Sequence, residues 1–392
     1  MNTYKRILFA MFFLLAGIIL WLPLIHLFFK PSLPTYFNDH AISLKAKLLA
    51  THQVLPWTTP TNNAALNKMR IANAEWDFMS RTYLVLALSN MALSEPENKT
   101  YYLSTIDSII NDTLKLEKQH GIYYFLMDYA KEKPWVSKKQ RSLFQDGEIA
   151  LMLAARQAVM VNDTFIEPLQ ERINIIIEVM KQSPMLSGES YPDECWTFCN
   201  VVALAAVKLS DYVTKDNHVE FIQQWILQAK EKLIDKKTGL LISAYTFDGK
   251  PLQGPEGSSI WMAAHLLYIL NKDFAQNQYS LSKKELGDSL FGFGYAREWP
   301  YSWSDSEDID SGPIVPFLKA SASSSGLAIL GARTFNDNDF LLKLIASLNF
   351  IGFPMREKNG LKYCASNQVG DAVLLYSMVT GPLWQKIETS SP

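Results

Sequence analysis

Two kinds of apolar pattern take turns along most of the chain. Segments of the first kind are apolar on nearly every side, which is typical of helices buried within a protein. Segments of the second kind repeat apolar residues at helical spacing and carry charges between them; residues 165–181, with Ile173 and Ile177, are an example. The pattern therefore predicts buried inner helices that alternate with amphipathic outer helices.

The predicted inner helices begin at intervals of roughly fifty to seventy residues, a period that is typical of stacked helical hairpins. They are residues 74–93, 146–161, 196–209, 258–270, 319–333 and 371–379. The predicted outer helices are residues 39–52, 101–117, 165–181, 218–234, 282–290 and 337–350. A linear solenoid needs polar caps and usually shows similar repeats, which are not evident here. We therefore predict a closed all-α ring of six inner and six outer helices, an (α/α)6 toroid.

Residues 7–29 form an apolar stretch without a charged residue, and Lys5 and Arg6 precede it. About 20 apolar residues are enough to cross a bilayer as a helix. The stretch is longer than the apolar part of a usual signal peptide and no A-x-A cleavage site follows it, although a cleaved signal peptide is the alternative. Because positive charges favour the cytoplasmic side, we expect a single-pass protein of the inner (plasma) membrane whose C-terminal domain is periplasmic or extracellular.

The chain is thus expected to consist of a transmembrane anchor, a linker, one toroid domain and a tail: residues 1–30, 31–37, 38–385 and 386–392. Pro and Gly are spread among the predicted loops rather than gathered at one point, which favours a single toroid domain. The expected partner of residues 7–29 is the lipid bilayer.

Composition excludes several classes of function. The 392 residues include 37 basic and 39 acidic ones, so no basic field for nucleic acid is present and no nucleic-acid partner is expected. Three cysteines can form at most one bridge, which excludes a disulfide framework. Six histidines are scattered without an HExxH motif, so no zinc site is predicted.

Four carboxylates stand close together ahead of the fifth predicted inner helix: Asp305, Glu307, Asp308 and Asp310. A Gly-Pro turn and a run of Ala, Ser and Gly follow, and we expect the acidic loop to reach the central cavity of the ring. Ca²⁺ binding by residues 305–310 is an alternative, although the EF-hand pattern fails because position 309 is Ile. No other cofactor is predicted.

Carboxylates and aromatic side chains also stand at the starts of the other predicted inner helices. They are Glu75, Trp76, Asp77, Asp146, Glu148, Tyr191, Asp193, Glu194, Trp196, Glu256 and Asp371. For any one position helix capping is the common explanation, and Asp146 and Asp371 look most like caps. Together, however, these groups would gather negative charge at one rim, which is costly unless they are solvated, hydrogen-bonded or functional.

Asp308 and Asp310 are the leading catalytic candidates, because paired carboxylates can divide acid and base roles when burial raises the pKa of one of them. Glycoside hydrolysis uses such a pair. Glu194 and Glu256 are the candidates for an opposing partner. The candidates for substrate binding are aromatic residues able to stack on sugar rings and two further acids: Tyr191, Trp196, Trp299, Trp303, Asp146 and Asp371.

Cys195 and Cys199 stand four positions apart at the start of a predicted buried helix, which would put both thiols on one helix face. An intrahelical disulfide at this spacing has poor geometry. A helix N-terminus would lower the pKa of a thiol and favour the reactive thiolate. The alternative is that both are small buried hydrophobic residues.

Over residues 70–380, approximately, the chain resembles the six-hairpin α/α-toroid proteins. Three stretches, SLFQDGEIALMLAAR, DIDSGPIVPFLKASASSSGLAILGAR and QVGDAVLLYS, are similar to a set of bacterial membrane-anchored toroid proteins. The toroid proteins include glycoside hydrolase and polysaccharide lyase families and the linalool dehydratase/isomerase group. The resemblance is specific for the fold, which hosts unrelated chemistries.

The predicted function is a glycan-active hydrolase that uses paired carboxylates at the cavity rim, and two other classes stay open as alternatives. The glycosidases of this fold imply acid pairs at inner-helix starts, a role that Asp193, Glu194, Asp308 and Asp310 could fill, with a carbohydrate or other envelope-derived substrate. The linalool group implies a lyase or isomerase that uses Cys199, with Cys195 as its partner. The third class is a non-catalytic glycan-binding or envelope assembly protein.

Overall fold

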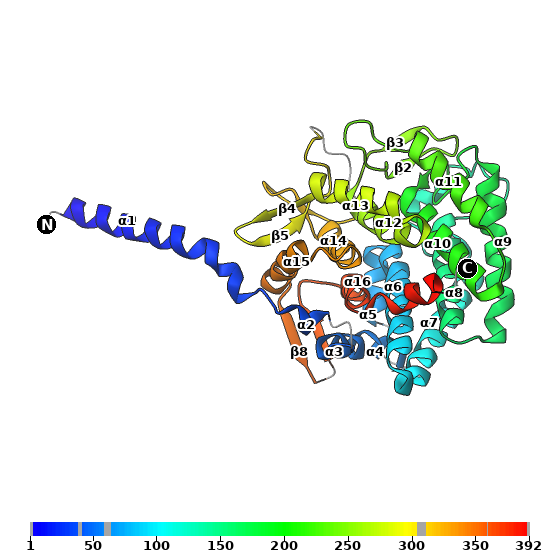
Figure 1. Ribbon diagram of the computed structural model, residues 1–392, viewed down its shortest axis with the longest axis horizontal. Helices are drawn as coiled ribbons and strands as arrows, with labels where there is room; N and C mark the ends of the chain where they lie inside the picture. The colour runs from blue at the N-terminus through cyan, green and yellow to red at the C-terminus, as the bar shows by residue number, and fades with distance from the viewer. Residues whose placement is uncertain (1–2, 38–40, 59–63, 304–310, 359, 390–392) are drawn as a thin grey trace.

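The computed structural model describes residues 3–37, 41–58, 64–303, 311–358 and 360–389. Within this part of the chain, six helices form an inner layer, and each packs against the next. They are α6 (Ala74–Ser94), α8 (Leu143–Val159), α10 (Thr197–Thr214), α12 (Gly257–Leu270), α14 (Ala322–Thr334) and α16 (Gln368–Val379). Because α16 also packs against α6, the ring is closed (Figure 1).

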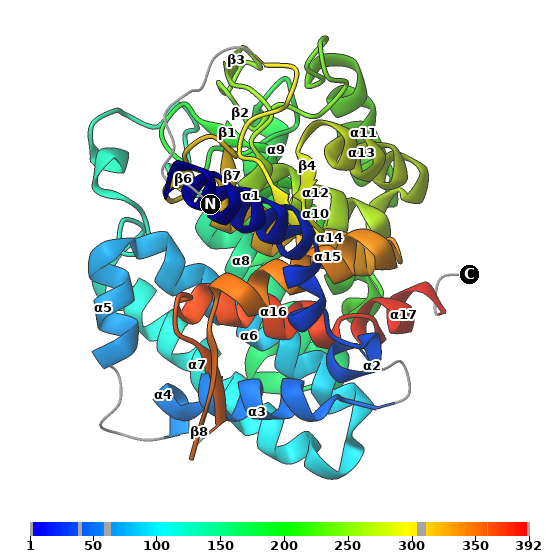
Figure 2. The ribbon, with the colours of Figure 1, turned by 90° about the vertical axis from the view of Figure 1, so that its left-hand side faces the viewer.

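The outer layer, over the same described ranges, is also formed by six helices. They are α3 (Leu44–Gln53), α7 (Lys99–His120), α9 (Ile166–Gln182), α11 (Val219–Lys232), α13 (Lys272–Glu285) and α15 (Asn338–Ile351). Although α3 comes first in the sequence, it packs against α16, the last inner helix. Figure 2 looks at the toroid from the side of α1 and shows α3 and α7 at one edge, with α11 and α13 at the opposite edge. The predicted all-α toroid of inner and outer helices is confirmed.

Short elements connect these helices. The strands pair antiparallel: β1 (Cys195–Trp196) with β2 (Ala244–Tyr245), β2 with β3 (Pro251–Gln253), β4 (Gly287–Leu290) with β5 (Phe293–Ala296), β6 (Ile314–Val315) with β7 (Ala320–Ser321), and β8 (Pro354–Glu357) with β9 (Gly360–Tyr363). The short helices are α2 (Leu33–Tyr36), α4 (Leu55–Thr58), α5 (Ala64–Ala72) and α17 (Pro382–Glu388), with 3-10 turns at η2 (Pro96–Asn98), η3 (Asp128–Lys131) and η4 (Asp163–Phe165).

The fifth outer helix was predicted at residues 282–290, and this boundary is wrong. The helix α13 covers Lys272–Glu285, and the following residues form strand β4. Its buried face includes three polar residues, Gln278, Ser282 and Glu285, so the apolar stripe is incomplete in the sequence. The Gln278 amide accepts a hydrogen bond from the Leu241 N–H at 2.8 Å, a long-range partner that the local pattern does not reveal.

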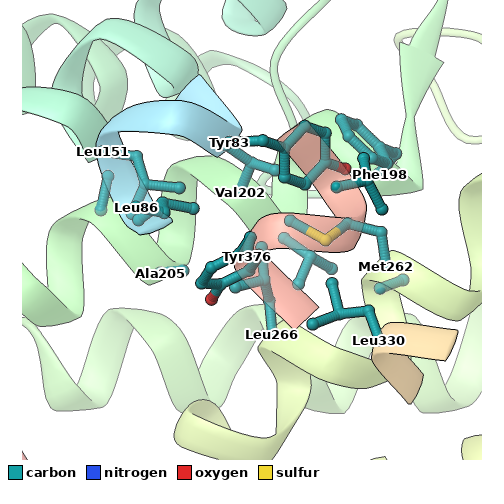
Figure 3. Packing of buried hydrophobic residues seen from close by; sticks show 14 of the residues in the cluster. Tyr83, Leu86, Leu151, Phe198, Val202, Ala205, Met262, Leu266, Leu330 and Tyr376 are labelled. Atoms are coloured by element: carbon teal, nitrogen blue, oxygen red, sulfur yellow. The ribbon is translucent and has the colours of Figure 1, made fainter. Parts of the chain in front are cut away.

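The hydrophobic core lies between the inner helices. Side chains from every inner helix meet there, among them Leu86, Leu151, Val202, Met262, Leu330 and Tyr376 (Figure 3). Gly147 of α8 allows a close approach to α10, because a Cβ atom at this position would lie 3.2 Å from the Cβ atom of Ala203. Small residues thus let the inner helices pack closely enough to close the ring.

A largely buried network of ion pairs joins the three consecutive helices α7, α8 and α9. Asp146 of α8 pairs with Arg141, whose Nε lies 3.0 Å from the carboxylate, and with Arg172 of α9. The same guanidinium lies 2.7 Å from Glu117 of α7. Burial alone would raise the pKa of Glu117, but Arg172 and Arg141 outweigh it and lower that pKa.

The N-terminal helix extends away from the toroid, and the residues that follow it pack against the toroid. Residues Thr3–Phe28, which form α1 (Thr3–Trp21) and the 3-10 helix η1 (Leu22–Phe28), are long and apolar enough by length and composition to cross a membrane (Figure 1). The ring of Phe29 then lies 5.0 Å from the ring of Phe350 on α15, which in turn lies 5.0 Å from that of Phe293 on β5. Asn349 donates a hydrogen bond to the Phe29 carbonyl oxygen at 2.8 Å. These contacts hold the toroid close to the end of its N-terminal helix.

Replacing Arg172 by Met is expected to lower the free energy of unfolding by about 3–5 kcal/mol, because Asp146 and Glu117 would keep their buried charges with one cation fewer. The measurement is urea unfolding of the full-length protein in micelles, followed by circular dichroism. The control is Lys139→Met, which removes an exposed pair with Glu178 and should cost less than about 1 kcal/mol. Equal losses in the two variants would contradict a stabilising role for the network.

Candidate functional site

The N-terminal ends of the inner helices converge on a cavity of about 170 Å³ that is partly open to solvent. Each inner helix contributes residues from its first turns to the lining, and Tyr129, Ser190, Tyr191 and Ser311 come from the connections. Helix N-termini carry partial positive charge and unpaired N–H groups. Their convergence therefore offers a favourable place for carboxylates or for an anionic or strongly polar ligand.

Glu75, in the first turn of α6, is held in place by an aromatic pair. The Tyr191 hydroxyl donates a hydrogen bond to the Glu75 carboxylate and accepts one from the Met127 N–H at 2.9 Å. The ring of Tyr191 stacks on that of Tyr129, with 4.5 Å between centroids. Burial, followed by the charge of Glu75, raises the pKa of Tyr191, so its hydroxyl stays protonated and serves as a fixed donor.

Glu148, one turn into α8, is fully buried behind the lining. Burial raises its pKa to about 8, a hydrogen bond with Thr82 lowers it, and the nearby charge of Glu75 raises it further. At neutral pH, Glu148 is therefore mostly protonated beside a carboxylate that a tyrosine hydroxyl stabilises. Glu148 can therefore carry a proton close to the carboxylate of Glu75.

Glu256 stands on the other side of the cavity. It occupies the position before the first turn of α12, its side chain lines the cavity and the residue is only 1 % exposed. On the closed ring, α12 lies opposite α6, because α8 and α10 separate them on one side and α14 and α16 on the other. Glu75 and Glu256 thus reach the cavity from opposite walls.

Of the two thiols, Cys199 lines the cavity, whereas Cys195 is buried outside the lining. The prediction that both lie on one helix face is wrong, because Cys195 belongs to strand β1 and Cys199 to α10. The expected lowering of the thiol pKa is also wrong. Burial raises the pKa of both thiols well above its usual value, and Glu75 and Glu148 raise that of Cys199 further.

The turn that carries Asp193 and Glu194 lies outside the lining. Asp193 has a left-handed backbone (φ 57°), and its side chain accepts a hydrogen bond from the Phe247 N–H at 3.1 Å. Glu194 lies 3.6 Å from Lys133 at the surface. These contacts hold the side chains of both acids at the turn, and neither side chain lines the cavity.

The two aspartates that were candidates for substrate binding lie outside the cavity lining. Asp146 is held by Arg141 and Arg172 and does not line the cavity, and neither does Asp371, whose pKa burial raises to about 7. Neither aspartate is the helix cap; Ser142 and Asn367 cap α8 and α16 instead.

Of the four aromatic candidates for substrate binding, two line the cavity and two do not. Tyr191 and Trp196 line the cavity, beside Trp76 of α6. Trp299 and Trp303 stack on each other with 6.2 Å between centroids and are absent from the lining. Within the described part of the chain, the indole nitrogen of Trp196 is buried and has no hydrogen-bond acceptor.

Asp308 and Asp310, and with them the calcium alternative at residues 305–310, lie outside the described residues. Ser311, which follows them directly, lines the cavity. Among the described residues no group of three or more His, Cys, Asp and Glu side chains could hold a metal ion.

The residues that sequence reasoning did not select are Glu75, Glu148 and Tyr129. The two glutamates were visible as acids at inner-helix starts, but nothing local distinguished them from capping residues. Tyr129 lies in the connection between α7 and α8 and carries no sequence signal.

No protein-family model matches the sequence, and no curated protein matches it. Several solved structures match the fold. The GH76A α-1,6-mannanase from Salegentibacter sp. HEL1_6 is 11% identical, with a TM-score of 0.54, over 85% of this chain and 98% of that chain. The unsaturated glucuronyl hydrolase from Bacillus sp. GL1 is 8% identical, with a TM-score of 0.51, over 85% and 94% of the two chains.

Dfg5 from Chaetomium thermophilum, solved in complex with glucosamine, is 10% identical with a TM-score of 0.52, over 91% of this chain and 94% of that chain. All of these neighbours are six-hairpin α/α toroids of the glycoside hydrolase-like kind. The chain therefore has the fold of this group, as its sequence resemblance implied. At such identities the likeness concerns the fold.

Glu148→Gln is expected to make stability less sensitive to pH. The folded-state pKa, about 8, lies above the ordinary value of 4.5, so Glu148 stabilises the fold fully below pH 4.5 and loses this contribution as pH rises toward 8. Relative to wild type, the variant should therefore gain roughly 4 kcal/mol between pH 4.5 and 8. Denaturant unfolding at several pH values measures this. The exposed Glu178→Gln is the control, and a parallel pH dependence in Glu148→Gln and wild type would refute the assignment.

Proposed function

We propose that the protein is a membrane-anchored, extracytoplasmic, glycan-active hydrolase whose reaction takes place between Glu75 and Glu256. The observation that carries the proposal is that these carboxylates reach one cavity from opposite inner helices. The fold supports it, because its neighbours include proteins named as a mannanase and a glucuronyl hydrolase, although a fold alone does not define a reaction.

In this proposal Glu75 is the base and Glu256 the acid. The hydrogen bond from Tyr191 favours the ionised form of Glu75, which would activate a water molecule. Glu256, buried on the opposite wall, would protonate the leaving glycosidic oxygen. The protonated Glu148 lies behind the lining and limits the negative charge of the site to the rim.

Aromatic side chains beside the two acids would bind the sugar. Trp76 and Trp196 line the cavity next to Glu75 and Tyr191, and flat aromatic faces pack well on the apolar faces of sugar rings. Asp308 and Asp310 stay candidates for the same reaction, because Ser311, next to them in sequence, lines the cavity.

Membrane anchoring belongs to the same proposal. The apolar N-terminal helix would cross the inner membrane, with the toroid on the periplasmic or outer side. The contacts of Phe29 with Phe350 would then keep the cavity near the bilayer, where envelope glycans are assembled or anchored.

Glu75→Gln and Glu256→Gln should each lower kcat for glycan hydrolysis by about 10²- to 10⁴-fold, since each removes a proton-transfer group. The full-length protein in lipid nanodiscs would be incubated with α-1,6-mannan, glucuronyl oligosaccharides and other envelope glycans, and new reducing ends measured by mass spectrometry. The matched control is the exposed Glu97→Gln, and Asp308→Asn/Asp310→Asn tests the acidic segment.

Two results would decide against this mechanism. Equal activity of wild type, Glu75→Gln and Glu256→Gln would place the chemistry elsewhere. Saturable glycan binding without any product, in a folded wild-type protein, would favour the binding or assembly class instead.

A lyase or isomerase that uses Cys199 is the second candidate, because this thiol lines the cavity close to Glu75 and Glu148. The raised pKa of Cys199 keeps the thiol protonated. At pH 7, iodoacetamide is therefore expected to modify the exposed Cys364 and to leave Cys199 unmodified over the same time. Peptide mass spectrometry checks this, and fast alkylation of Cys199 in a Cys364→Ser variant would favour the thiol enzyme.

A further inference from the structure

The cavity changes character with depth. On α6 the first turn presents Glu75, and the following turns present Met79 and Tyr83. On α14 Ser323 stands at the start, and Leu327 lies one turn further in. Because the helices enter the cavity with their N-terminal ends, residues later in each helix lie deeper. The rim is therefore polar and the floor apolar.

The floor is formed by side chains from α6, α14 and α16. They are Met79, Tyr83, Leu327 and Val373, hereafter called the apolar floor. Phe144 and Phe198 add apolar lining from the first turns of α8 and α10. Tyr83 and Phe198 belong both to the cavity lining and to the hydrophobic core (Figure 3). Burial raises the pKa of Tyr83 well above its usual value, so the floor carries no phenolate charge. Water in such a place finds few partners, whereas apolar cavities bind apolar ligands.

A glycine preserves the space above this floor. Gly326 lies within α14 and lines the cavity, and no heavy atom lies within 4 Å of the position that a Cβ atom would take. Glycine inside a helix costs about 1 kcal/mol relative to alanine, and no close helix contact explains it here. An occupant of the cavity would explain it, since a larger side chain would fill the space that the occupant needs.

We propose that the cavity binds an amphiphile, with a sugar head group at the rim between Glu75 and Glu256 and a hydrocarbon chain against the apolar floor. The identity of the head group rests on the proposed function, whereas the hydrocarbon chain rests on the floor and on Gly326. The ligand is a glycolipid of the bilayer or a soluble alkyl or aryl glycoside. Both share the same chemistry, a sugar joined to an apolar group.

The test uses the full-length protein in phosphatidylcholine nanodiscs and n-alkyl β-glucosides from hexyl to octyl, below their micelle concentrations. Binding is followed by the fluorescence of the tryptophans, two of which line the cavity, and empty nanodiscs correct for partition into lipid. Each added methylene is expected to lower Kd about threefold to fourfold, as burial of one CH₂ group predicts. Glucose itself should bind far more weakly than any of them.

Gly326→Leu is expected to weaken octyl glucoside binding at least tenfold, whereas Gly326→Ala changes Kd by less than threefold. The added side chain meets open space, so the variant should fold normally, and circular dichroism checks this. Ser280→Leu adds the same bulk at an exposed position of α13 and should bind like wild type. A Kd that does not depend on chain length, or that Gly326→Leu leaves unchanged, would overturn the proposal.

Two further experiments are needed. The first distinguishes a ligand from the bilayer from a soluble one, and the second distinguishes failure of this proposal from failure of the proposed function. If a glucosyl diacylglycerol placed in the nanodisc competes with octyl glucoside, the bilayer supplies the amphiphile; without competition, a soluble amphiphile does. Glu75→Gln should lower hydrolysis by about 10²- to 10⁴-fold and keep the chain-length dependence of binding. Chain-length dependence without hydrolysis in wild type refutes the proposed function alone, whereas hydrolysis of short glycans without chain-length dependence refutes the amphiphile alone.

Discussion

The packing of α16 against α6 is the contact on which the rest of the structure depends. It closes the inner helices into a ring, and a closed ring brings their N-terminal ends to one place. The partial positive charge at these ends stabilises carboxylates at the rim, where Glu75 and Glu256 lie. Small residues such as Gly147 let the helices approach closely, and Gly326 leaves open space beside the cavity. The cavity is thus a consequence of how the ring closes.

Burial divides the ionisable groups of the site into two sets. Glu148, Cys199 and Tyr83 lie in or behind the deeper lining, and burial raises the pKa of each, so all three are largely neutral at physiological pH. The acids of the rim lie where helix ends and a tyrosine hydroxyl can stabilise charge. Proton transfer at the rim and apolar binding at the floor are therefore compatible within one cavity. The same division argues against a thiolate nucleophile.

The likeness to mannanases, a glucuronyl hydrolase and Dfg5 concerns the path of the backbone, and it leaves the reaction to the side chains of this chain. This toroid combines apolar side chains in its cavity with an N-terminal helix attached to α15 through Phe29 and Phe350. Under the two proposals above, both features relate the site to lipid. A glycan joined to an apolar group would satisfy the rim and the floor together.

The sequence by itself determined the alternation of buried and amphipathic helices and the apolar N-terminal helix, because both depend on periodicity and composition within short segments. It failed at α13, where Gln278 and Ser282 belong to the buried face through partners distant in sequence. The sequence also indicated that acids gather at the starts of the inner helices. It could not show which of them line the cavity, because Glu256 and Glu194 have similar local sequence contexts. In the structure Glu256 lines the cavity, whereas Glu194 lies near a surface lysine. Only the tertiary structure decided that Glu75 faces Glu256 and that Asp146 is held by two arginines, because ring closure and side-chain direction depend on contacts between distant segments.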